Sequence, residues 1–260
     1  MEPEHGAAVL INSASLEIAS FFLLVAAFEA WERLRPARAT NRLAELKLNL
    51  LSFALAVLMA YLARDTVEAA LNGLRPGLVL TALDDLRRLP AWAKIALCYP
   101  IIDFVLYWIH WVQHRSAVAW RTHVWHHTPT QMYWLAGFRT SFMHSFIYNI
   151  PQTIVPMHLF HLSPVEAGIA YSIGLFIQFW IHGNVDVNLG WLKYVFIRPQ
   201  DHRVHHAVMN VRGLNLGATF SVWDRLFGTY LDPDRMPAGY ALGLAEPFRR
   251  RAVPRMLLGV

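Results

Sequence analysis

Eight of the thirteen histidines of this chain lie in three short groups, and imidazole is a side chain that binds transition metals. The groups are HWVQH, HVWHH and HRVHH, which contain His110, His114, His123, His126, His127, His202, His205 and His206. The second and third share the spacing HxxHH. Intervals of three and four residues bring side chains to one face of a helix, so each group can present its imidazoles together.

The number of histidines favours two metal ions over one. A structural zinc site is closed by four ligands, usually with cysteine among them, and this chain has the single cysteine Cys98. Any one histidine more often fills a core or a surface, but that explanation does not account for three groups at helical spacing. Imidazole binds zinc, copper, iron and nickel alike, so the ligand type alone does not name the metal.

Two further histidines are candidate ligands. His182 closes an apolar segment in the sequence WIHGN, and His144 begins another in RTSFMHS. For His144, a role as a gate to the site is the alternative to ligation.

Asp103 and Tyr107 are the candidate catalytic residues, because they share a helix face with His110 and His114 at intervals of four, seven and eleven residues. A carboxylate inside an apolar helix is costly and usually functional. We expect Asp103 to accept the ring N–H of a metal-bound imidazole and so to orient it. The alternative is a local hydrogen bond to the backbone near Pro100.

The composition indicates a membrane protein. Apolar residues make up 55% of the chain and charged residues 16%, against about 25% in typical soluble domains. The net charge is +5, but the basic residues flank apolar runs and form no single stripe. This arrangement favours anionic lipid headgroups over nucleic acid as a partner. The N-terminal MEPEH lacks the basic region of a cleavable signal peptide, so we expect the first apolar run to be retained.

Five apolar segments are candidate membrane spans, at residues 9–31, 48–63, 95–112, 141–160 and 165–182. The predicted fold class is therefore all-α: an integral membrane helical bundle of four to five spans, with a cytoplasmic helical histidine-rich domain that holds two metals. Residues 64–94, with breaks at Asn72-Gly73, Pro76-Gly77 and Pro90, are predicted to form an amphipathic surface segment.

The distribution of Lys and Arg predicts the orientation. Five lie in residues 32–47, three in 113–140 and ten in 183–260, whereas 64–94 contain the other five of the 23. By the positive-inside rule, the histidine side of this multi-pass protein is cytoplasmic, with the N-terminus outside. This topology places all three histidine groups and His182 just above the same membrane face.

The order HWVQH, HVWHH, WIH, HRVHH and WDRLFGTY resembles the fatty acid hydroxylase/sterol desaturase superfamily of membrane di-iron oxygenases. The stretch from FWIHGNVDVNLG to WDRLFGTY is most similar to its alkylglycerol monooxygenase branch. The resemblance implies a di-iron catalytic domain at residues 95–232, after N-terminal membrane helices and a connector at 1–94 and before a basic tail at 233–260. The sequence departs from that branch at Gly183-Asn184, where Thr-Glu is expected, and at His144, where a non-ligand is expected.

The resemblance also implies a function. The eight grouped histidines and His182 would hold two Fe ions in a non-haem monooxygenase. With O₂, the enzyme would hydroxylate, or alternatively desaturate, the hydrocarbon part of a lipid such as a sterol, fatty acyl chain, carotenoid or ether lipid. The chain shows no Gly-rich dinucleotide fingerprint, so the electrons must come from outside, from a reductase, an electron carrier or a reduced pterin.

Two other functions use the same residue types. A zinc-dependent membrane hydrolase would need three protein ligands, an open position and usually a glutamate base, and neither HxxHH motif contains Glu. A metal-binding membrane transporter would place carboxylates and histidines along a path at mid-membrane, whereas these histidines lie at the ends of apolar segments. A non-catalytic scaffold leaves the histidine spacing unexplained.

Overall fold

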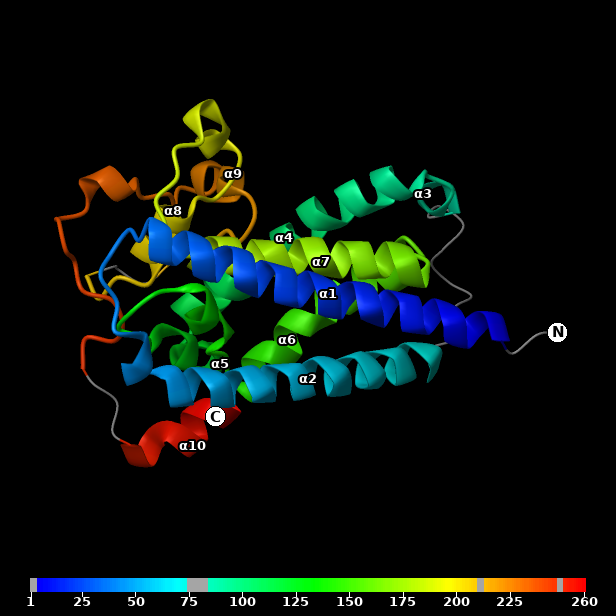
Figure 1. The fold of residues 1–260 in the computed structure, drawn as a ribbon, viewed down its shortest axis with the longest axis horizontal. Helices are drawn as coiled ribbons and strands as arrows, with labels where there is room; N and C mark the ends of the chain where they lie inside the picture. The colour runs from blue at the N-terminus through cyan, green and yellow to red at the C-terminus, as the bar shows by residue number, and fades with distance from the viewer. Residues whose placement is uncertain (1–3, 74–83, 210–212, 247–249) are drawn as a thin grey trace.

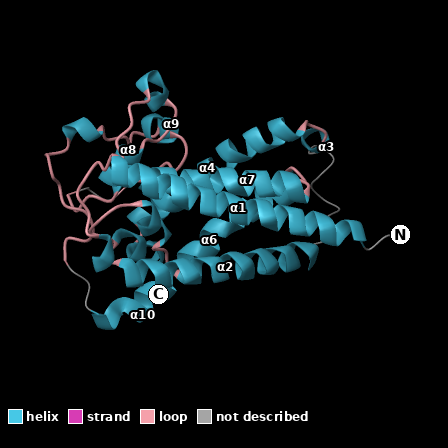
Figure 2. Ribbon diagram, viewed as in Figure 1, coloured by secondary structure: helices cyan, strands magenta, loops and turns pink. Residues whose placement is uncertain are grey.

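The computed structural model of the protein describes residues 4–73, 84–209, 213–246 and 250–260, and it shows long helices side by side with short helices and loops at one end (Figure 1). The long helices are α1 (Glu4–Leu34), α2 (Leu46–Gly73), α4 (Ala91–Arg115) and α7 (Pro164–His182). The shorter α6 (Phe142–Thr153), which continues into a π-helix at Ile154–Leu159, packs against α2 and α4. Over these residues the chain forms helices and loops without a strand, which confirms the all-α prediction (Figure 2).

Two of these helices, α4 and α7, are long and apolar enough to cross a membrane, judged over the described residues by length and composition. The apolar part of α2, Leu46–Ala60, is shorter. The predicted spans at 9–31 and 48–63 fall within α1 and α2. The count of four to five spans and the cytoplasmic side remain predictions.

The connector predicted at residues 64–94 is partly helical. Helix α2 continues to Gly73, the short α3 covers Asp84–Arg87, and Pro90 directly precedes α4. The predicted break at Pro76-Gly77 lies outside the described residues.

The chain from His110 to His127 is two helices and a turn rather than the single helix that its spacing allows. Helix α4 ends at Arg115, and the Ser116 hydroxyl accepts a hydrogen bond from Ala119 N to begin α5 (Ala117–His123). A 3₁₀ helix, Val124–His127, follows directly. Serine is a preferred N-cap because its oxygen satisfies a free amide of the first turn. The break turns the second histidine group back toward the first.

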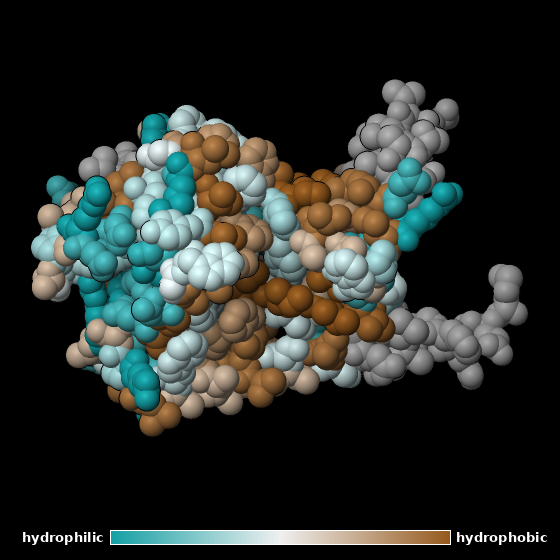
Figure 3. Space-filling view, turned by 90° about the horizontal axis from the view of Figure 1, so that it is seen from above, coloured by the Kyte–Doolittle hydropathy of each residue, from teal (hydrophilic) through white to brown (hydrophobic). Residues whose placement is uncertain are grey.

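Apolar and polar side chains are separated along the bundle. Polar residues gather over the end that carries the short helices, while the long helices present an apolar surface (Figure 3). Large apolar side chains are exposed on α1, α2, α4 and α7, among them Phe22, Leu58, Phe104 and Phe176. Below the polar end, the rings of Trp134 and Phe179 stack at 4.9 Å and join α7 to the 3₁₀ helix Trp134–Phe138. Such an extended apolar surface is typical of contact with lipid.

Candidate metal centre

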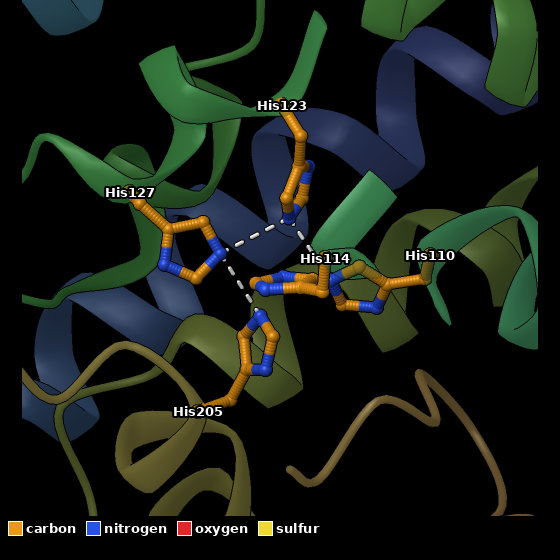
Figure 4. A group of neighbouring side chains, drawn as sticks. All are labelled: His110, His114, His123, His127 and His205. Atoms are coloured by element: carbon orange, nitrogen blue, oxygen red, sulfur yellow. Dashed lines mark hydrogen bonds between the residues drawn. The ribbon is translucent and has the colours of Figure 1, made fainter. Parts of the chain in front are cut away.

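Nine of the ten predicted ligands converge at the polar end in two groups, and within each group one nitrogen per residue lies within 4.8 Å of the others. Group one consists of His110, His114, His123, His127 and His205 (Figure 4). Group two consists of His126, His182, His202 and His206. All nine side chains are buried, at most 6% exposed. Helices α4, α5 and α7 supply ligands with the 3₁₀ helix and α8 (Pro199–His205), so the whole polar end is built around them.

Each HxxHH motif divides its histidines between the two groups. In the first motif, His123 and His127 belong to group one and His126 to group two. The second motif reverses this division, because His202 and His206 belong to group two and His205 to group one. Residues four apart lie above one another on a helix, whereas neighbours point about 100° apart. Each HxxHH motif therefore supplies histidines to both groups, so the backbone links the two groups at two places.

Backbone carbonyls set the tautomer of four of these rings. The Nδ1–H of His110 donates to Leu216 O at 2.8 Å, and that of His205 donates to Leu214 O at 2.9 Å. In group two, the Nδ1–H of His182 donates to Gln178 O at 2.9 Å and that of His126 to Arg139 O at 3.3 Å. A neutral imidazole has one N–H, so Nε2 of each ring carries a lone pair.

These lone pairs face one another and need a cation between them. His126 Nε2 and His182 Nε2 are 3.3 Å apart, and neither has a proton to share. The closest pair in group one, His110 Nε2 and His123 Nε2, are 2.9 Å apart. Two ligands at right angles on a metal with bonds of about 2.1 Å lie about 3.0 Å apart. The donor set therefore fits a metal ion in each group.

Burial keeps these ligands neutral. Removal from water lowers the pKa of His126 and of His205 well below the ordinary value of 6.5, and neighbouring histidines lower it further. The same causes act on His123, His127, His202 and His206. A metal binds the unprotonated nitrogen, so the protein provides its ligands in the binding form at neutral pH.

His144 lies outside both groups. Its Nδ1 is 3.0 Å from Nδ1 of His123, on the side of that ring away from the other ligands. Its own ring stacks on Tyr148 at 3.9 Å, and the Tyr148 hydroxyl donates to Gln113. The structure thus places His144 behind a group-one histidine, in contact with His123, and outside the two groups that the other nine predicted ligands form.

Asp103 also differs from its prediction, because its hydrogen-bond partners are backbone amides and an indole and not an imidazole. Its two oxygens accept hydrogen bonds from the N–H groups of Ala218, Thr219 and Phe220 and from the Trp223 indole. These amides follow Leu216, whose carbonyl fixes His110. Asp103 therefore acts on His110 through this loop, whose first amide contact, Ala218, lies 115 residues away in sequence.

A second carboxylate holds the same loop. Asp224 accepts hydrogen bonds from Leu216 N, Gly217 N and the Thr229 hydroxyl, and burial raises its pKa to about 6. Thr229 also shares a hydrogen bond with the Tyr107 hydroxyl, at 2.8 Å. Tyr107 is thus directed at this loop and not at a histidine.

Gly137 is a functional residue that the sequence pattern did not indicate. A Cβ atom on it would lie 2.5 Å from Cγ of His182, which is closer than side chains approach one another. The Gly137 carbonyl also accepts a hydrogen bond from the Gln178 side chain, one turn before His182. Its only sequence signal is a glycine in an otherwise bulky stretch, YWLAGF.

Group two is also braced by α1 and α2. The buried Glu32 carboxylate accepts the backbone N–H of Asn184, two residues after His182, and that of Trp134. The guanidinium of Arg139, whose carbonyl fixes His126, donates to Asn49 and pairs with Glu45 at 3.1 Å. The N-terminal helices therefore hold the backbone of two group-two ligands.

Nine buried imidazoles in two groups, at the polar end of an apolar helical bundle, form two histidine clusters suited to holding metal ions. The sequence profile of the fatty acid hydroxylase family matches residues 95–229, more than half of the 260 residues, and the chain belongs to this family. This match confirms the resemblance seen in the histidine motifs.

Three named proteins are similar to part of this chain. The chain is 31% identical over 157 residues to alkylglycerol monooxygenase of Xenopus tropicalis, covering 57% of this chain and 33% of that protein. It is 29% identical over 175 residues to the ornithine lipid hydroxylase OlsE of Rhizobium tropici, covering 62% and 52%. It is 26% identical over 143 residues to Delta(7)-sterol 5(6)-desaturase erg3B of Aspergillus fumigatus, covering 54% and 41%. The chain thus matches about one third to one half of each relative. No solved structure matches it.

Proposed function

We propose that this protein is an O₂-dependent membrane oxygenase that hydroxylates the hydrocarbon part of a lipid, using two Fe ions held by the nine grouped histidines. The observation that carries the proposal is the pair of facing lone pairs on His126 and His182, together with the crowded nitrogens of group one. The three relatives named above, two hydroxylating enzymes and one desaturase, support oxidation of a lipid.

The ligand count favours iron over a zinc hydrolase. Group one offers five nitrogens, one more than the four ligands of a typical zinc site. A catalytic zinc usually has three protein ligands and an open position, an arrangement that neither group resembles. The all-imidazole donor set suits iron as well as zinc, so coordination number is the property that separates the two metals.

The side chains described above would hold, orient and shield the irons. When bound, the irons would supply the reduction of O₂ that a protein side chain cannot perform. The carbonyls of Leu216, Leu214 and Gln178 keep the ligand nitrogens aimed inward. Burial of all nine rings excludes bulk water from the groups. The balanced reaction converts a C–H bond, O₂, two electrons and two protons into C–OH and water, so an external donor supplies the electrons, either a reductase, an electron carrier or a reduced pterin.

The lipid would approach from the bilayer along α4, α6 and α7. Exposed apolar side chains on α4 and α7 would face the acyl chains, and the ends of both helices carry ligands. The excess of basic residues in the segments around the histidines supports a cytoplasmic site. A transporter would need ligands along a path at mid-membrane, whereas these gather at one end.

The first test is metal analysis of the full chain, purified in detergent without a histidine-affinity step. We expect about two irons per chain. The second test supplies a chemical reductant and ¹⁸O₂ with alkylglycerol, ornithine lipid or sterol, and follows the lipid by mass spectrometry. One ¹⁸O atom in the product supports hydroxylation, whereas a new double bond without ¹⁸O would assign a desaturase. Zinc with a hydrolysed lipid would overturn the proposal.

A further inference from the structure

A small polar cavity of about 230 Å³ lies at the histidine end of the molecule, outside both histidine groups. It forms where the loop after α1 meets two later loops. Its walls are residues 38–40, 130–132 and 239–242, with Asn184 and Arg203. None of the functions discussed above uses it.

Arg203 lines this wall and is a buried cation. The side chain is almost fully buried, at 4% exposed, and it gives Nη1 to Asp186 at 2.7 Å and Nη2 to the Val185 carbonyl at 2.8 Å. Its Nε has no hydrogen-bond partner among the described residues. A buried N–H without an acceptor is costly, so proteins rarely keep one unless something else binds it.

Arg38 is a second guanidinium in the same wall. It lies 3.9 Å from the centre of the Tyr240 ring, and Nη1 donates to the Tyr240 carbonyl at 2.8 Å. The Asn184 side chain holds the Arg38 backbone at both N and O, at 3.1 and 2.7 Å. A guanidinium has five N–H donors in a fixed fork, so Arg38 is held rigidly with donors left for a ligand.

The cavity is positively charged. Burial lowers the pKa of Arg38, and the nearby charge of Arg203 lowers it further. The acidic partner Asp186 is 58% exposed, so solvent screens much of its charge. Of the residues described, the wall itself contains two guanidinium groups and no carboxylate, so an added anion would stabilise it.

We propose that this cavity binds the phosphate group of a ligand. A phosphate carries about −1.5 to −2 charges and three strong acceptor oxygens, which match the two guanidinium groups of the wall, above all Arg38 with its remaining donors. The volume lies below the ~300 to 1,000 Å³ of typical ligand pockets, so it admits a headgroup but not an acyl chain. Arg203 follows His202, and Asn184 lies two residues after His182. A bound phosphate would therefore lie directly behind two ligands of group two.

The test is calorimetric titration of the full chain, in a neutral detergent and a phosphate-free buffer, with inorganic phosphate. We expect saturable binding that weakens about tenfold or more in Arg38→Gln, the loss expected for one charge-assisted contact. The matched control is Arg225→Gln, because Arg225 also lies on a tyrosine ring, 3.6 Å from the centre of Tyr230, but outside the cavity. No binding by the parent protein, or equal loss in both variants, would overturn the proposal.

A second variant keeps the test decisive if Arg38→Gln does not fold. Gln131 Oε1 accepts the backbone N–H of Asn41, and Gln131→Glu retains that acceptor while adding a negative charge to the cavity wall. We expect this variant to bind phosphate at least about tenfold more weakly. Binding equal to that of the parent contradicts the proposal.

Competition identifies the source of the phosphate. Displacement of inorganic phosphate by phosphatidylglycerol in mixed micelles, but not by diacylglycerol, assigns a lipid headgroup. Displacement by glycerol 3-phosphate alone assigns a soluble ligand. Displacement by neither would contradict an organic phosphate ligand.

Discussion

Residues 95–229, which match the fatty acid hydroxylase family, contain most of the side chains that hold group one. Group two is also held by α1 and α2, which lie outside those residues. The loop that fixes His110 and His205 is held by Asp103 and Asp224. Group two relies on Glu32 of α1 and on Asn49 of α2, which supports Arg139. The carbonyl bond to His126 is also longer, 3.3 Å against 2.8 Å for His110.

This difference indicates that the two groups can be weakened separately. Group one has five donors, and the two carboxylates that hold its loop lie within residues 95–229, so it should retain its metal under conditions in which group two loses it. Group two draws additional support from α1 and α2, outside those residues. Each of the following predictions tests that separation.

The largest effect is expected from removing a ligand. His126→Ala should release the group-two metal and leave about one ion per chain, and His205→Ala should do the same to group one. Both should lower lipid oxidation by more than the ~10 to 100-fold typical of losing a residue behind a ligand. Metal analysis and product formation measure this, with His158→Ala, in the π-helix, as the control. Full metal content in either variant would remove that residue from the ligand set.

Gly137→Ala should remove the group-two metal alone. The new methyl group would occupy space only 2.5 Å from Cγ of His182, so the ring must move. Gly174→Ala, on the same helix as His182, is the control, because its Cβ would meet only the Tyr99 hydroxyl, at 3.8 Å. A Gly137→Ala protein with two ions would show that His182 does not need its present position.

Asp103→Asn should weaken group one by about 10 to 100-fold in metal affinity or turnover. The asparagine side chain has the same shape, but its NH₂ group would face a backbone N–H that bonds a carboxylate oxygen in the parent protein. The protein should retain measurable metal. Asp85→Asn is the control, since that side chain is 90% exposed. Metal affinity and rate equal to those of the parent would contradict a role for the carboxylate in holding the loop.

Glu32→Gln should weaken group two by about tenfold and leave group one unchanged. Glutamine retains one oxygen for the amides of Asn184 and Trp134 but loses the ion pair with Arg42, now at 2.9 Å. Stepwise chelation followed by metal analysis separates the two ions. If the group-one metal is lost first in this variant, the proposed dependence of group two on α1 is wrong.

A smaller effect is expected between pH 7.5 and 6.5. The folded histidines have lowered pKa values, whereas those of the unfolded chain titrate near 6.5. Protons therefore bind preferentially to the unfolded, metal-free chain, so the free energy of unfolding is largest above pH 7.5 and falls as the pH drops through 6.5. Thermal unfolding across this range should show a modest decline that steepens below pH 6.5. Stability that rises on acidification would contradict buried neutral ligands.

The histidine motifs and the apolar segments predicted nine histidines that do converge and an all-helical fold, because helical spacing is a local property. They could not predict which histidine joins which group, since the neighbours His126 and His127 belong to different groups. The break at Ser116 depends on a cap that competes with a continuous apolar helix. Asp103 and Tyr107 were found by their shared face, but their partners lie more than 100 residues away in sequence.

Gly137 and Glu32 illustrate a different limit. Each acts through a contact that exists only when distant segments pack, the close approach of the Gly137 backbone to the His182 ring in one case and the hydrogen bond from the Asn184 amide to Glu32 in the other. The spacing of apolar and polar residues in either segment does not predict these contacts. His144 had the right residue type at the right end of a helix, and only its position behind His123 separates it from a ligand.

The division of each HxxHH motif between the two groups couples the filling of one to the filling of the other. A metal in group one fixes His127 and His205, whose direct neighbours His126 and His206 belong to group two. The entropy of ordering those backbones is then already lost when the second ion arrives, which is the condition for positive cooperativity without a change of shape. Because group one has five donors against four, it should still fill first, and a metal titration of the empty protein should show singly loaded chains whose second site binds more tightly than the same site does in His205→Ala.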